Sequence, residues 1–468
     1  MKTRKEHDLL GYKEVPSEAY YGIQTLRAVE NFDICGVKLS AYPKYIKALA
    51  MVKWAASKAN NDLGLLSDDL NDAITKACEE IIDGKLINEF PVDMIQGGAG
   101  TSTNMNANEV IANRALEILG YEKGDYEKCH PNNHVNLSQS TNDAYPTGIK
   151  VGLILKNEDL IENLKELIAS FRAKGVEFKD VLKMGRTQLQ DAVPMTLGQE
   201  FEAWAANLEE EILRLNENAK LFLEVNMGAT AIGTGINSEP DYPAKCIKHL
   251  RDITKMEIVL AGNLIEATPD TGSYVMYSSA IKRLAIKLSK ICNDLRLLSS
   301  GPRCGFNEIN LPKMQPGSSI MPGKVNPVIP EVVNQIAYKV IGNDLTVTFA
   351  AEAGQLQLNV MEPVIVRSIF ESMEMLKNGM ATLKERCIDG ITANVEHCKE
   401  MVLNSIGIVT AVNPTLGYEA SSRIAQRALS ENRSVYDLIL EEGLLTKEKL
   451  DEILAPERMI KPQKFIKA

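Results

Sequence analysis

Apolar residues recur every three or four positions along the middle of the chain, which is the spacing of one face of an α-helix. The clearest stripe lies between Pro194 and Pro240, an interval without proline. Thr196 and Gln199 at its start match a capping box, in which two side chains satisfy free backbone N–H groups. We predict one long amphipathic helix that ends near Gly228. The stripe consists of Phe201, Trp204, Leu208, Ile212, Leu215, Ala219 and Phe222.

A second stripe predicts another long helix, which ends before Gly301 and Pro302. Its members are Tyr277, Ile281, Leu284, Leu288, Ile291, Leu295 and Leu298. Further helical stripes occupy residues 157–172, 328–350 and 364–387. Alternating patterns typical of β-strands are scarce. The fold class predicted from these patterns is all-α, with a central bundle of long antiparallel helices.

The stripes also suggest how the chain is divided. We predict a mainly helical N-terminal domain over residues 1–140, in which short helices mix with turns. The central bundle should occupy 141–395, and a small helical domain 396–468. Apolar stripes this long usually need more partners than one chain supplies, so a homo-oligomer is expected.

Composition narrows the classes of protein. The chain has 468 residues, 45% apolar and 24% charged, which are ordinary values for a folded globular protein. The first residues lack the apolar stretch of a signal peptide, and no later stretch reaches membrane-spanning length without charges, so we expect a cytoplasmic protein. Eight dispersed cysteines show no metal-binding or disulfide spacing, so neither is expected.

The net charge is −10, which disfavours nucleic acid as a partner. A protein this acidic binds an anionic substrate only where cations, amide N–H groups and hydroxyls converge. The functional site should therefore appear in the sequence as such a cluster.

Three loop segments have the composition of such a cluster, namely residues 97–106, 134–143 and 317–327. Each combines hydroxyl and amide side chains, and the first and third also contain several glycines, which let the backbone approach a ligand. Capped helix starts and turns explain the first two segments equally well on local grounds. The third, Gly-Ser-Ser-Ile-Met-Pro-Gly-Lys-Val-Asn-Pro, is more typical of a mobile lid that carries a hydroxyl base. It lacks the spacing of a phosphate-binding loop.

The third segment resembles the signature loop of the aspartase/fumarase superfamily. The resemblance spans nearly the whole chain. It continues in the motifs at residues 14–27, 100–106, 138–143, 185–191 and 410–414.

Two places favour the ammonia-lyase branch over class II fumarases. Residues 101–104 read Thr-Ser-Thr-Asn and residues 140–145 read Ser-Thr-Asn-Asp-Ala-Tyr, where fumarases usually read Thr-Gln-Ser-Asn and Ser-Ser-Asn-Asp-Val-Phe. Gln188 stands where fumarases and some aspartases carry histidine. The resemblance implies reversible deamination of L-aspartate to fumarate and ammonia, without a cofactor or metal. It also implies a homotetramer whose active sites are shared between subunits, with no nucleic-acid or membrane partner.

Residue roles follow from the same resemblance. Ser318 is expected to remove the Cβ proton, giving an enediolate that hydroxyl and backbone donors stabilise. The donors around the β-carboxylate are expected to be Thr101, Ser140, Thr141 and Ser319. Ligands of the α-carboxylate are expected to be Thr187, Lys324 and Asn326, and acceptors of the amino group Asn142 and Gln188.

Two other functions stay open from the sequence. A class II fumarase would share the fold, the loop and the base. A structural relative without activity, as in the eye lens, is disfavoured because Ser318, Lys324 and Asn326 are retained. Arg27, His134 and Glu362 lie in family-like stretches and receive no role.

Overall fold

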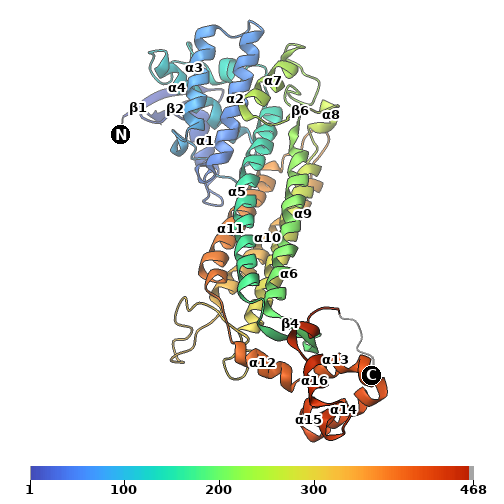
Figure 1. The fold of residues 1–468 in the computed structure, drawn as a ribbon. Coiled ribbons are helices and arrows are strands. Elements are labelled where there is room, and N and C mark those ends of the chain that lie inside the picture. The colour runs from blue at the N-terminus through green and yellow to red at the C-terminus, as the bar shows by residue number, and fades with distance from the viewer. Residues whose placement is uncertain (1, 463–468) are drawn as a thin grey trace. The chain divides into compact units, whose positions relative to one another are not determined.

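The computed structural model describes residues 2–462 and is dominated by helices, which confirms the predicted all-α class (Figure 1). The helices that come first are α1 (Ile23–Asn31), α2 (Pro43–Asp62), α3 (Asp68–Ile82) and α4 (Thr101–Ile118). The long ones are α5 (Thr141–Glu177), α6 (Leu197–Ala219), α9 (Gly272–Leu298), α10 (Val328–Glu352) and α11 (Glu362–Arg386). Two shorter helices, α7 (Tyr242–Thr254) and α8 (Leu264–Ala267), separate α6 from α9.

The last part of the described chain is built from short helices, as the sequence predicts. They are α12 (Val395–Asn404), α13 (Val409–Leu416), α14 (Tyr418–Glu431), α15 (Val435–Glu441), α16 (Lys447–Ile453) and α17 (Pro456–Met459). Apolar side chains of these helices pack into one core that includes Val412, Ile424, Leu438 and Leu450.

Strands form only small two-stranded sheets within residues 2–462. The antiparallel hairpins are β1 (Thr3–Asp8) with β2 (Gly11–Pro16), and β3 (Leu182–Thr187) with β4 (Gln190–Thr196). The shorter pairs are β5 (Glu224–Val225) with β6 (Val259–Leu260), and β7 (Ile309–Asn310) with β8 (Thr392–Ala393). The sequence analysis predicted none of these hairpins.

The chain divides into two compact units. Unit 1 comprises Met1–Glu162, Ile212–Ala285 and Tyr338–Lys377, and unit 2 comprises Asn163–Glu211, Ile286–Ala337 and Asn378–Ala468. The three-domain division with boundaries at 140 and 395 stays a prediction.

The predicted capping box at the start of α6 is confirmed. The Thr196 N–H donates to Gln199 Oε1 at 3.0 Å, and the Gln199 N–H donates to Thr196 Oγ1 at 3.1 Å. The predicted end of this helix near Gly228 is wrong, because α6 ends at Ala219 and a short 3-10 turn follows. The chain leaves the helix here because Asn226 and Gly228 bond to the start of α5, where Asn226 Nδ2 donates to the Asn142 carbonyl at 3.0 Å.

Two glycines let α5 and α6 approach closely within unit 2. Gly175 of α5 faces Gly198 of α6, and Arg172, earlier in α5, reaches Glu209, later in α6, at 2.6 Å. The two helices therefore run antiparallel here. A Cβ atom on Gly198 would lie 2.4 Å from the Gly175 carbonyl oxygen and 2.7 Å from Lys179 Cα. Backbone atoms block this position, so glycine is required.

The two facing glycines give a matched test of this contact. Gly198→Ala should destabilise the protein by about 1–3 kcal/mol through overpacking. Gly175→Ala should be neutral or stabilising by up to about 1 kcal/mol, because its Cβ meets nothing closer than 3.4 Å and alanine favours helix. Unfolding midpoints measured by circular dichroism check the difference. Equal midpoints for the two variants would contradict the close approach.

Candidate functional site

The first predicted loop ends at the N-terminus of α4, in unit 1. Gly100 has a left-handed φ of 86°, and a Cβ there would lie 2.5 Å from the Tyr145 ring. Thr101 is exposed, and its Oγ1 donates to the Gly98 carbonyl at 2.8 Å. The free N–H groups of a helix N-terminus favour bound anions. At the start of α4, the Thr101 N–H donates to the Gly98 carbonyl and the Thr103 N–H to Gln96 Oε1, both at 3.1 Å, so the helix dipole is what favours a carboxylate beside Thr101.

The second predicted loop leads into α5, and Asp143 holds its conformation. This buried carboxylate accepts N–H groups from Ser140 at 3.0 Å, Gly228 at 3.1 Å and Thr230 at 2.9 Å. Burial raises the pKa of Asp143 to about 6, while the N–H donors and the charge of Lys53 lower it. The backbone that carries Ser140, Thr141 and Asn142 is thereby tied to the segment after β5.

The amide of Asn142 has a defined orientation. Its Nδ2 donates to the Ala231 carbonyl at 2.8 Å, which leaves Oδ1 to accept a hydrogen bond from a ligand. Pro146 lies inside α5 and has no N–H, so it cannot bond the Asn142 carbonyl four residues earlier. Asn226 Nδ2 supplies the missing donor to that carbonyl at 3.0 Å.

A cavity of about 480 Å³ borders this loop in unit 1. Its lining includes Ser140, Asn136 and three non-glycine residues with left-handed backbone, namely Ser138 (φ 62°), Thr230 (φ 55°) and Asn237 (φ 64°). Residues held in such conformations cost free energy and cluster at functional sites. The strained backbone therefore supports a binding role for this cavity.

Thr187 and Gln188 lie at the turn of the β3–β4 hairpin, in unit 2. Thr187 pairs with Gln190, and Gln188 and Leu189 between them have φ values of 56° and 62°. This is the geometry of a type I′ turn, which normally uses asparagine and glycine. Gln188 and Leu189 therefore occupy this turn at a cost in free energy, because both hold a left-handed backbone conformation.

Buried ion pairs anchor this hairpin. Glu308 is fully buried and lies 2.9 Å from Lys183 Nζ and 2.5 Å from the Arg186 guanidinium. Arg186 also stacks on the Phe306 ring at 4.3 Å. Glu308 directly precedes β7, so this carboxylate ties the β3–β4 hairpin to the start of β7.

The third loop closes on itself in unit 2. The Gly317 N–H donates to the Lys324 carbonyl at 2.8 Å, and Asn326 Nδ2 donates to the Gly317 carbonyl at 2.7 Å. A Cβ on Gly317 would lie 2.6 Å from the Lys324 carbonyl oxygen, so glycine is required. Ser319 and Lys324 are exposed.

Ser318 accepts two backbone hydrogen bonds in this loop. Its Oγ receives the N–H of Ile320 at 3.2 Å and that of Met321 at 3.0 Å. Donors that point at an oxygen favour its ionised form. The loop therefore places two backbone donors at the oxygen that the sequence predicts to be the base. The apolar side chain of Ile320 beside it is 83% exposed.

The predicted site residues therefore fall into two groups. Unit 1 carries Thr101, Ser140, Thr141 and Asn142, where Asn104 of α4 donates to Thr141 Oγ1 at 3.1 Å and joins two of the loops. Unit 2 carries Thr187, Gln188, Ser318, Ser319, Lys324 and Asn326.

The comparisons with known proteins agree with these motifs. A family model described as lyase matches residues 11–342, and one described as fumarase C C-terminus matches residues 408–461. An aspartate ammonia-lyase of Pseudomonas aeruginosa is 62% identical over 98% of both chains. The chain belongs to the aspartase/fumarase superfamily. It is an enzyme of the lyase class.

Two solved structures show the same fold as this lyase. The crystal structure of a fumarate lyase:delta crystallin from Brucella melitensis bound to cobalt has a TM-score of 0.95 at 56% identity, covering 98% of this chain and all of that one. A class II fumarase from Schistosoma mansoni has a TM-score of 0.91 at 35% identity, covering 99% of this chain and all of that one.

The described part of the lyase has neither a metal-binding cluster of acidic, histidine and cysteine side chains nor a membrane-spanning helix. Among residues 2–462, no group of three or more His, Cys, Asp or Glu side chains is arranged to hold a metal ion. No helix in that range has both the length and the hydropathy needed to cross a bilayer.

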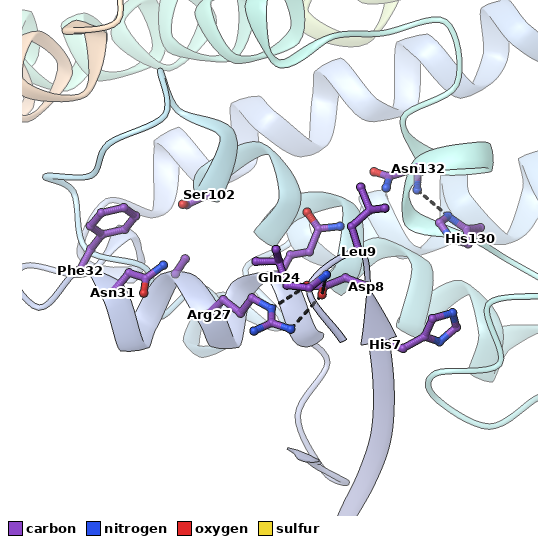
Figure 2. Close-up of a pocket in the computed structure, with 12 residues that line it drawn as sticks. His7, Asp8, Leu9, Gln24, Arg27, Asn31, Phe32, Ser102, His130 and Asn132 are labelled. Carbon is purple, nitrogen blue, oxygen red and sulfur yellow. Dashed lines mark hydrogen bonds and ion pairs between the residues drawn. The ribbon is translucent and has the colours of Figure 1, made fainter. Parts of the chain in front are cut away.

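Arg27 and His134, which the sequence left without roles, have local partners in the lyase. The Arg27 guanidinium bonds both oxygens of Asp8, at 2.7 and 2.9 Å (Figure 2). This pair lines a cavity of about 620 Å³ between the β1–β2 hairpin and α1, which Ser102 and His130 also line. His134 Nδ1 accepts the His130 N–H at 2.9 Å.

Glu362 of the lyase is a buried acid, 4% exposed, at the first position of α11. Burial raises its pKa to about 8, and the positive charge of Lys150 opposes this shift. The folded state therefore prefers the neutral acid. This contribution to stability is complete below the ordinary value of 4.5 and is lost as pH rises through about 8.

Replacing Glu362 by its neutral isostere should remove this pH dependence. The unfolding midpoint of Glu362→Gln should fall less than that of the wild type between pH 4.5 and about 8. Glu374→Gln on the same helix is the control. Burial raises the pKa of Glu374, but the bonds to Lys156 and Lys377 outweigh it and leave the pKa lowered, so the loss of this carboxylate should reduce stability near neutral pH instead. Parallel plots of unfolding midpoint against pH for the wild type and Glu362→Gln would contradict the conclusion that the folded state prefers the neutral form of Glu362.

Proposed function

We propose that the protein catalyses the reversible deamination of L-aspartate to fumarate and ammonia in the cytoplasm, without a cofactor. The observation that carries the proposal is the likeness to proteins named aspartate ammonia-lyase, at 55–62% identity over nearly the full chain. The class II fumarase is more distant, at 35%. The loop geometry described above supports the same chemistry.

Ser318 is the proposed base. Its ionised oxygen takes the Cβ proton of aspartate, and the electron pair of the broken C–H bond moves into the β-carboxylate as an enediolate, or aci-carboxylate. The electrons then return to form the carbon–carbon double bond while the C–N bond breaks and ammonia leaves with its electron pair. The two N–H groups that point at Ser318 Oγ support the first step, because they stabilise the ionised base.

The enediolate carries two negative charges, so its stabilisation is the main demand on the site. The proposed donors are the hydroxyl and backbone groups of Thr101, Ser140, Thr141 and Ser319. One donor of this kind contributes about 2.7–4 kcal/mol to the transition state, so several meet most of that demand. The exposed position of Thr101 at the start of α4 supports this role, and its hydroxyl must turn from the Gly98 carbonyl to donate to the substrate.

The proposed α-carboxylate ligands are Thr187, Lys324 and Asn326, and those of the ammonium group are Asn142 and Gln188. The free Oδ1 of Asn142 supports its assignment, because an ammonium group requires acceptors. A leaving hydroxyl makes no such demand. This difference is the physical reason to prefer aspartate over malate.

The rival function is hydration of fumarate by a class II fumarase. The purified protein is given fumarate with ammonium, then fumarate alone, and products are separated by chromatography. Aspartate formed only with ammonium supports deamination. Malate formed from fumarate alone would show the rival reaction instead.

Assembly into a homotetramer completes the proposal. A stripe on α10 within unit 1 exposes Tyr338 at 60%, Leu345 at 56% and Phe349 at 65%. Apolar side chains at this spacing on a helix favour burial against another chain. We propose that residues of units 1 and 2 from different subunits meet in each active site.

Replacing the base tests the proposed mechanism. Ser318→Ala should lower kcat by at least about 10²-fold, the contribution typical of a general base. Its unfolding midpoint should match the wild type, because Ser318 bonds only within its own loop. Fumarate formation, followed by ultraviolet absorbance, measures kcat. An equally active variant would refute the role of Ser318.

Mixing two inactive variants tests the shared site. Ser318→Ala alters unit 2 and Thr141→Val alters unit 1, so hybrid tetramers should contain some sites in which neither change is present. Co-expressing both chains should restore part of the wild-type activity, while each variant alone stays nearly inactive. Hybrids without recovered activity would show that each site is built from one chain.

A further inference from the structure

A fully buried lysine lies behind the starts of α4 and α5. Lys53 of α2 is 0% exposed, and its Nζ donates to three amide oxygens: Asn104 Oδ1 at 2.7 Å, Asn136 Oδ1 at 2.9 Å and Gln139 Oε1 at 2.8 Å. Three acceptors match the three N–H donors of an ammonium group. All of these residues belong to unit 1.

The charge of Lys53 fixes which way the amides face. An ammonium group donates and cannot accept, so each amide must present its oxygen to Nζ and its NH₂ elsewhere. The other ends of the amides agree with this assignment. Asn136 Nδ2 donates to the Gln139 carbonyl at 3.2 Å, and Gln139 Nε2 donates to the Val135 carbonyl at 3.0 Å.

The orientation of the Asn104 amide determines which hydrogen bond Thr141 receives. With its Oδ1 held by Lys53, Asn104 Nδ2 donates to Thr141 Oγ1 at 3.1 Å. A hydroxyl that accepts from this side keeps its own proton free to donate elsewhere. Thr141 is only partly buried at the start of α5, so its proton is available to a ligand.

We propose that Lys53 is a positioning residue that acts through Asn104 to make the Thr141 hydroxyl donate toward the carboxylate of the substrate. This inference rests on the proposed function. It adds that the donor direction of Thr141 is imposed from the protein interior. The hydroxyl is thereby preorganised, so it need not turn when negative charge develops on the carboxylate.

Two substitutions at Asn104 separate this role from simple support of the fold. Asn104→Asp keeps the shape and the bond to Lys53, but its second oxygen can only accept. That oxygen faces both Thr141 Oγ1 and Asn136 Oδ1, each 3.1 Å from Asn104 Nδ2 in the wild type. The Thr141 proton then turns inward, and kcat should fall about 10²–10³-fold, as for a lost oxyanion donor. Asn104→Ala leaves the hydroxyl free to rotate, so its loss should be smaller. The oxygen that faces Asn136 is a structural cost of the aspartate variant alone, so the Thr141→Val background is needed to separate it from the effect on the hydroxyl.

The new charge of the aspartate needs its own control. Asn108→Asp places the same charge one turn later on α4, where Asn108 donates to Asn136 and Met105 and not to Thr141. It should lower kcat much less than Asn104→Asp. In a Thr141→Val background, Asn104→Asp should change the residual kcat by about threefold or less, because a coupled pair is not additive. Purely electrostatic damage would persist in that background.

The measurements are kcat, KM and the unfolding midpoint of each purified tetramer, with aspartate as substrate. The wild type is tested first, and if it hydrates fumarate instead, the proposed function fails and the same variants are ranked on hydration. If Asn104→Asp does not fold, a double-mutant cycle of Asn104→Ala and Thr141→Val tests whether the two residues are coupled in kcat. Equal losses for Asn104→Asp with and without the Thr141 hydroxyl would overturn the inference, and so would a larger loss for Asn104→Ala. A wild type with neither activity would overturn both proposals.

Discussion

The carboxylate of Asp143 organises unit 1 around one turn. It binds three backbone N–H groups from two distant segments, at Ser140, Gly228 and Thr230. A buried carboxylate tolerates the loss of water only where hydrogen bonds replace it. The segment after β5 must therefore reach the start of α5, and this requirement ends α6 at Ala219. The orientation of Asn142 depends on the same segment, through Ala231 and Asn226.

Unit 2 holds its hairpin with a network of buried ion pairs. The buried carboxylate of Glu308 is paired with Lys183 and Arg186, and Lys183 also bonds Glu200. Breaking such a pair leaves an uncompensated buried charge, which is strongly destabilising. The arrangement holds the strained turn at Gln188 in place without any contact at the turn itself. Buried charges therefore hold the backbone at the start of α5 in unit 1 and at the β3–β4 hairpin in unit 2, beneath side chains that are at least partly exposed.

The sequence predicted what depends on local pattern. The capping box of Thr196 and Gln199 and the helix that ends at Leu298 follow from spacing alone, and the structure confirms both. The predicted end of α6 was wrong because Asn226 and Gly228 form hydrogen bonds with residues that are distant in the sequence. The β3–β4 hairpin was missed because Gln188 and Leu189 are not the residues that its turn normally uses.

The candidate site divides in the same way. Its exposed residues were found through motif resemblance, and their roles stay predictions. The buried residues Lys53 and Asp143, which hold these exposed residues in place, were not predicted. In a sequence, a lysine or an aspartate within a helix is indistinguishable from an ordinary surface charge. One signal was present for Lys53, which interrupts an otherwise apolar run from Leu49 to Ala56 in α2. Only the packing of α2 on α4 shows that this position faces inward.

The network around Lys53 also bears on how an acidic protein accommodates a dianion. The chain has a net charge of −10, so a cation near the site contributes most where few carboxylates bond it. Lys183 bonds carboxylates, whereas the hydrogen-bond partners of Lys53 are neutral amide oxygens and the charge of buried Asp143 also acts on it. Burial lowers the pKa of Lys53 to about 7, and the charge of Asp143 opposes this shift. The three amide oxygens are the acceptors that the ammonium form of Lys53 requires. The Asn104 amide, whose oxygen accepts from Lys53, is polarised by that hydrogen bond and donates through its NH₂ group to Thr141 Oγ1. Thr141 is the partly exposed end of this hydrogen-bonded chain.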